Sequence, residues 1–88
     1  MRIKVQSLEE AQEIVRRRVK AEFGSKAEVN FLRTTLETDL SSGKKLWLVE
    51  GNIQIRRWLF LKRVWHFTYF VNAEDGRILI MRVKRGGD

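Results

Sequence analysis

The sequence predicts an α+β fold, with one N-terminal amphipathic helix packed on a four-stranded antiparallel β-meander. Three observations predict it. Apolar residues recur at helical spacing between residues 8 and 23, apolar and polar side chains alternate between residues 49 and 56, and two strand-like runs flank an acidic glycine turn at residues 73–76. With 88 residues, the chain is expected to form a single domain with one small core.

The helix is predicted to span Leu8 to Phe23. Ser7 is a favourable N-cap, and Glu10 three residues later completes the pattern of a capping box. Acidic residues fill the first turns and basic residues the last, which suits the helix dipole, and Gly24 is a natural stop. The apolar stripe consists of Leu8, Ala11, Ile14, Val15, Val19 and Phe23.

Four strands are expected after the helix, and residues 1–6 are read as a short strand or an arm. Gly51 interrupts the second strand, which indicates a bulge, a bend or a close approach of the helix. Residues 85–88 are expected to form a tail. The expected strands are Val29 to Thr38, Leu46 to Trp58, Val64 to Asn72 and Arg77 to Lys84.

The alternation within these strands assigns side chains to the two faces of the sheet. The face under the helix is expected to carry Trp47, Val49, Ile53, Ile55, Trp65, Phe67, Tyr69, Val71, Leu79, Met81 and Val83. The opposite face is expected to carry Arg56, His66, Thr68, Phe70, Ile78, Ile80, Arg82 and Lys84.

Positive charge is concentrated in the second half of the chain. The net charge is +7, with +1 in residues 1–43 and +6 in residues 44–88. Such a one-sided field favours nucleic acid, acidic lipid or an acidic protein as a partner. Alternatively, the cations keep the domain soluble and protect sheet edges from pairing. The high content of Lys, Arg and Glu is also typical of thermophilic proteins.

The sequence contains few residues that carry out catalysis. It has no cysteine and one histidine, His66, so it predicts neither an enzyme, a metal site nor a bound cofactor. Without cysteines, a signal-peptide pattern or an apolar run of 18 residues, we expect a cytoplasmic protein with no transmembrane segment.

The basic, aromatic hairpin between Ile53 and Asn72 is the strongest functional candidate. Its apolar stretch Trp58 to Leu61 lacks any residue that favours a turn. We expect the tip to fold back on the domain, to pack in a homodimer, or to dip into an anionic membrane surface. Protein–protein contact or self-association is the favoured function, and nucleic-acid binding is the alternative. The candidate contact residues are Arg56, Arg57, Trp58, Phe60, Leu61, Lys62, Arg63, His66, Phe70, Arg82 and Lys84.

Three short segments resemble those of the PepSY domain, a small cystatin-like α+β module. They are residues 7–11 at the helix start, residues 47–51 on a central strand, and residues 67–79, a strand–turn–strand unit. The resemblance implies the same helix-on-sheet fold and contributes no catalytic residues. It also implies a possible binding or restraining role toward peptidases, as in some members of that family.

Overall fold

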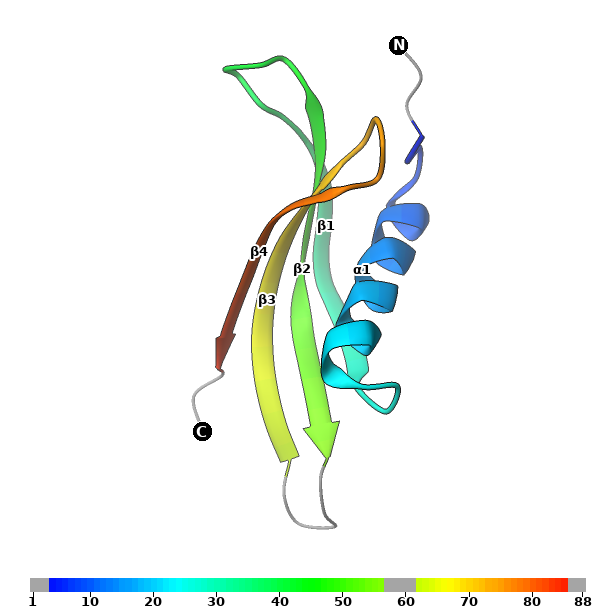
Figure 1. Ribbon diagram of the computed structural model, residues 1–88. Coiled ribbons are helices and arrows are strands. Elements are labelled where there is room, and N and C mark those ends of the chain that lie inside the picture. The colour runs from blue at the N-terminus through cyan, green and yellow to red at the C-terminus, as the bar shows by residue number, and fades with distance from the viewer. Residues whose placement is uncertain (1–3, 57–61, 86–88) are drawn as a thin grey trace.

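The computed structural model describes residues 4–56 and 62–85, and it confirms the α+β fold. A single helix, α1 (Leu8–Phe23), packs on one face of an antiparallel sheet with the strand order β1-β2-β3-β4 (Figure 1). The face under the helix is called the inner face, and the opposite face is called the outer face. The strands are β1 (Glu28–Thr38), β2 (Lys45–Arg56), β3 (Lys62–Asn72) and β4 (Ile78–Arg85).

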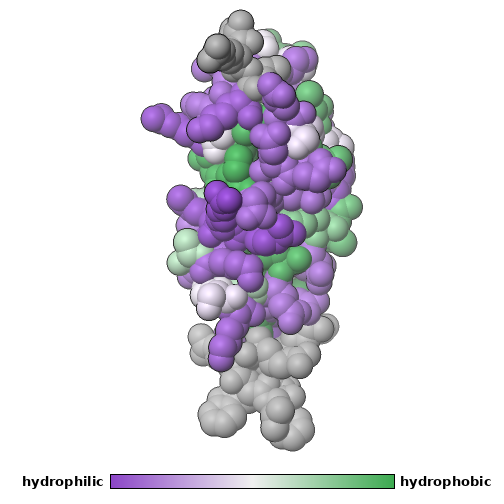
Figure 2. Space-filling view, turned by 90° about the vertical axis from the view of Figure 1, so that its right-hand side faces the viewer, coloured by the Kyte–Doolittle hydropathy of each residue, from purple (hydrophilic) through white to green (hydrophobic). Residues whose placement is uncertain are grey.

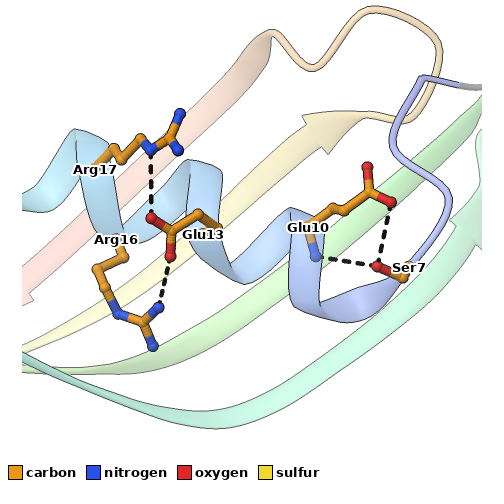
Figure 3. Close-up of polar contacts among 5 residues, drawn as sticks. All are labelled: Ser7, Glu10, Glu13, Arg16 and Arg17. Atoms are coloured by element: carbon orange, nitrogen blue, oxygen red, sulfur yellow. Dashed lines mark hydrogen bonds and ion pairs between the residues drawn. The ribbon is translucent and has the colours of Figure 1, made fainter.

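Local capping interactions determine both ends of α1, which has the predicted bounds. The backbone N–H of Glu10 donates to the Ser7 hydroxyl oxygen at 3.2 Å, and the same hydroxyl lies 3.4 Å from the Glu10 carboxylate (Figure 3). At the other end, Gly24 has a φ of 104° and its N–H donates to the carbonyl of Lys20. The positive φ explains why glycine stops the helix here.

The hydrophobic core lies between α1 and the inner face of the central strands. Ala11, Val15 and Val19 of the helix are fully buried there. On the sheet side, Val49 and Ile53 of β2 and Tyr69 and Val71 of β3 are fully buried, and Val49 pairs with Tyr69. The predicted inner row of β2 and β3 and the predicted helix stripe therefore lie in the core or pack against it, except for Leu8 in the first turn, which is 42% exposed.

Gly51 marks a close approach, as expected, but the approaching groups come from the sheet and not from the helix. A Cβ at this position would lie 2.7 and 2.9 Å from two ring carbons of Phe67, and it would overlap the backbone oxygen of Asn30. Gly51 pairs with Phe31, next to a register shift in β1 between Phe31 and Arg33. The missing side chain thus makes room for the Phe67 ring beside a β-bulge.

Residues 4–7, the described part of the segment before the helix, form an arm and not a strand. Val5 is buried, and its N–H donates to the carbonyl of Ala73 at 2.9 Å. The indole N–H of Trp47 donates to the carbonyl of Val5, also at 2.9 Å, in a buried position. These two hydrogen bonds attach the arm to β2 and to the turn between β3 and β4.

The expected burial of the inner face of β4 was wrong. Leu79, Met81 and Val83 are 51%, 42% and 38% exposed. The helix lies over β1 and β2, whereas β4 lies at the far edge of the sheet (Figure 1). An α-helix is about 10 Å across, while three steps between strands span roughly 14 Å, so one helix cannot cover four strands.

Two further corrections concern the ends of β4. A register shift places Ile78 opposite Val71, so Ile78 packs against the core and does not lie on the outer face as predicted. The shift has this effect because a one-residue slip moves a side chain to the other face. Arg85 belongs to β4, where it pairs with Trp65, and not to the expected tail.

Candidate functional site

An apolar patch lies on the outer face of the sheet, which no other element covers in the described part of the chain. Leu48 of β2, Phe70 of β3 and Ile80 of β4 stand in one cross-strand row. Leu48 is only 9% exposed, although no element of the described residues lies above it. Ile80 is 45% exposed. These three side chains are called the outer patch.

The predicted outer row of polar and basic residues lies beside this patch. Going along β4 from Ile80, Arg82 pairs with Thr68 and Lys84 pairs with His66. On the same face of β2, Glu50 stands opposite Thr68. Four of the predicted contact residues therefore share one face, namely His66, Phe70, Arg82 and Lys84.

The remaining candidate residues lie elsewhere. Arg63 pairs with Ile55. Together with Phe23 at the end of α1 and Trp65 of β3, it lines a small hollow on the inner face. Arg56 pairs with Lys62 at the last step of the β2–β3 ladder. The predicted tip residues Arg57, Trp58, Phe60 and Leu61 lie outside the described residues.

Three of the four cations of the helix, all arginines, pair with carboxylates of the same helix. Glu13 accepts hydrogen bonds from Arg16 at 2.8 Å and from Arg17 at 3.3 Å, and Arg18 donates to Glu22 at 2.9 Å (Figure 3). The hydrogen bond from Arg16 is the main reason why the pKa of Glu13 lies below its ordinary value. Viewed from the helix side, hydrophilic side chains cover much of the surface (Figure 2).

The cations of β4 are not neutralised in this way. Among residues 4–56 and 62–85, none of Arg82, Lys84 and Arg85 makes an ion pair, whereas Arg33 of β1 pairs with Glu37 and Glu50. Arg77, just before β4, reaches Asp75 only at 3.9 Å. Three of the ten basic residues in the second half of the sequence therefore lie, without an ion pair in the described residues, on the edge strand β4.

A second apolar surface, which the sequence reasoning missed, lies on the inner side of this edge. Met81 and Val83 are exposed there. Beside the start of β4, α1 and the β3–β4 turn enclose an open hollow of about 560 Å³, whose lining includes Ile14, Arg17 and Ile78. The signal that could have revealed this surface is the width of one helix compared with four strands.

The described residues contain no group of His, Cys, Asp and Glu side chains that could hold a metal ion. The same part of the chain contains no helix long and apolar enough to cross a membrane. His66 is exposed on the outer face, next to Asn52 and Lys84 in the register. The arrangement can therefore offer apolar contact and cationic hydrogen-bond donors to another molecule.

Taken together, the fold and this site define a helix-on-sheet module with one open sheet face and one cationic edge. Comparison with protein-family models, with curated proteins and with solved structures gave no match. The resemblance to PepSY domains therefore remains a prediction.

Proposed function

We propose that this chain is a non-enzymatic protein-binding module whose contact surface is the outer face of the sheet. The observation that carries the proposal is the outer patch of Leu48, Phe70 and Ile80, which lies toward the β3–β4-turn end of a face that no described element covers. Protein interfaces commonly have such an apolar centre within a polar rim. Here Arg82, Lys84 and His66 supply one side of the rim.

Self-association through the outer face can be tested with the isolated protein. The molar mass would be measured by light scattering over a hundredfold range of protein concentration. We expect a dimer at high concentration, and we expect Ile80→Ser to shift its dissociation by at least tenfold. Leu40→Ser is the matched control, because Leu40 is 95% exposed in the turn between β1 and β2, away from the patch.

The hairpin tip belongs to the same proposal. Trp58 and Phe60 follow the end of β2 in the sequence, so a Trp58→Ser and Phe60→Ser double variant tests whether the tip extends the contact surface. A wild-type chain that stays monomeric at the highest concentration would exclude self-association. The partner of the outer face would then be a different protein.

Nucleic-acid binding is the second candidate, and one observation favours it. His66, Phe70, Arg82 and Lys84 share a face, so cations for phosphates lie beside an aromatic ring that a base could stack on. Affinity for generic RNA and single-stranded DNA should then fall steeply with salt. In a plot of the logarithm of the affinity against the logarithm of the salt concentration, Arg82→Ala should reduce the slope by about one. The absence of binding at low salt would eliminate this candidate.

A further inference from the structure

β4 has a free edge. It pairs with β3 on one side only, and the strand order ends with it. The backbone groups on its other side therefore have no partner strand in the described part of the chain. An edge of eight residues is long enough to receive an additional strand.

The inner side of this edge is suited to apolar side chains. Met81 and Val83 are exposed there because α1 lies over other strands. A strand added next to β4 would place every second side chain beside these two residues, at the distance of a cross-strand pair. The open hollow beside the start of β4 adds the apolar side chains of Ile14 and Ile78, and Arg17, Arg18 and Arg77 also line it.

The outer side of the same edge is suited to acidic side chains. Arg82 and Lys84 point to the outer face, and within the described ranges neither makes an ion pair. The alternate side chains of an added strand would stand beside them. Opposite charges in such cross-strand positions are favourable, and like charges are unfavourable.

A second copy of this chain satisfies these requirements poorly. Pairing β4 with β4 brings Arg82, Lys84 and Arg85 of both copies into one short ladder, where they repel each other. Pairing β4 with β1 of another copy is a head-to-tail contact, which joins successive copies into a ring or an open chain and not into a symmetric dimer.

We propose that the β4 edge binds an extended, acidic segment of another protein in which apolar and acidic residues alternate. The segment becomes a fifth strand, with its apolar side chains beside Met81 and Val83 and its carboxylates beside Arg82 and Lys84. This docking site goes beyond the outer-face proposal, because it uses the backbone edge and the inner side of β4 and does not require the outer patch.

The test uses an eight-residue peptide of alternating valine and glutamate, labelled for fluorescence anisotropy. A peptide with the same composition in two blocks has the same charge but lacks the alternation. We expect the alternating peptide to bind at least tenfold more tightly than the block peptide. Amide hydrogen exchange should slow at β4 when the alternating peptide is bound, since the free edge becomes hydrogen-bonded.

Charge reversal tests the position of the site. Arg82→Glu with Lys84→Glu should weaken the alternating peptide at least tenfold and should create affinity for an alternating valine–lysine peptide. Lys26→Glu with Lys44→Glu changes the net charge equally at two exposed positions outside the strands, and it should have less than a threefold effect. Ile80→Ser should leave peptide binding within threefold, so that this proposal and the outer-face proposal can fail separately.

Three outcomes would overturn the proposal. Equal binding of the alternating and block peptides would show attraction by charge alone. Equal losses in the two double variants would show that the site is not at β4. Protection of the β4 amides that increases with protein concentration without peptide would show that a second copy occupies the edge.

Discussion

Gly51→Ala adds one methyl group at a crowded point of the sheet. The new Cβ would lie 2.7 Å from one ring carbon of Phe67, whereas carbon atoms in contact are normally about 3.5–4.0 Å apart, so the ring would have to move by roughly 0.8 Å. It would also overlap the backbone oxygen of Asn30 on β1, which cannot move without disturbing the adjacent bulge.

The free energy of unfolding should fall by about 2 kcal/mol. Overpacking a core costs about 1–3 kcal/mol, and two obstructed directions place this site at the upper end. Replacing glycine by alanine restricts the unfolded chain, which offsets the loss by about 0.4–1 kcal/mol. For a domain of this size, a net loss of 2 kcal/mol corresponds to a Tm lower by about 8–16 °C.

Urea unfolding followed by circular dichroism measures this change. The slope of the free energy of unfolding against urea concentration should equal that of the wild type, so that the shift in midpoint reports stability alone. Phe67→Leu in the Gly51→Ala background separates the two obstacles. If the ring is the main obstacle, the double variant should lose less than the sum of the single losses. A Gly51→Ala variant at least as stable as the wild type would refute the close approach described here.

Three further predictions concern single side chains. Trp47→Phe removes the buried donor to the Val5 carbonyl and should cost about 1–3 kcal/mol in urea unfolding; a loss below about 0.5 kcal/mol, the low end for a net hydrogen bond, would contradict this role. Tyr69→Phe removes a buried hydroxyl without a hydrogen-bond partner in the described residues and should be neutral or stabilising by about 1 kcal/mol, while a clear loss would reveal a partner. Burial, followed by the Glu22 charge, raises the pKa of Tyr69, so this group contributes to the free energy of unfolding below its ordinary pKa of 10.0, and the contribution is lost as the pH rises through the raised pKa. Tyr69→Phe should not show this loss of stability at alkaline pH. Hydrogen bonding from Arg16 lowers the pKa of Glu13, so the ionised Glu13 carboxylate stabilises the folded state above the ordinary pKa of 4.5, and this stabilisation is lost as the pH falls through the lowered pKa. Glu13→Gln, but not the control Glu9→Gln, should therefore reduce the dependence of the urea midpoint on acid pH.

Features determined by neighbouring residues were predictable from the sequence. The bounds of α1 followed from Ser7 and Gly24, which act on the backbone within one turn. The shared face of His66 and Phe70 followed from the two-residue period of a strand. The same period explains why Arg63, at an odd position, lies with the inner residues of β3.

Features determined by the assembled layers were not predictable in this way. The alternation along β4 placed Met81 and Val83 on one face, but it could not show that the helix covers β1 and β2 and leaves β4 exposed. Ile78 was assigned to the wrong face because the bulge in β4 leaves no periodic signal of its own. Both errors concern the edge strand, where tertiary contacts are fewest.

The uncovered surfaces of this domain follow from its proportions. One helix is wide enough for about two strands, so a four-stranded sheet necessarily leaves β4 exposed on the inner side and every strand exposed on the outer side. Arg16, Arg17 and Arg18 on the helix have acidic neighbours, whereas edge cations without such neighbours discourage pairing with another cationic strand. In the described residues, Arg82, Lys84 and Arg85 lack such neighbours, and they lie on the strand with the most exposed apolar side chains. Unpaired charge and exposed apolar area on the same strand point to a partner that supplies both complements.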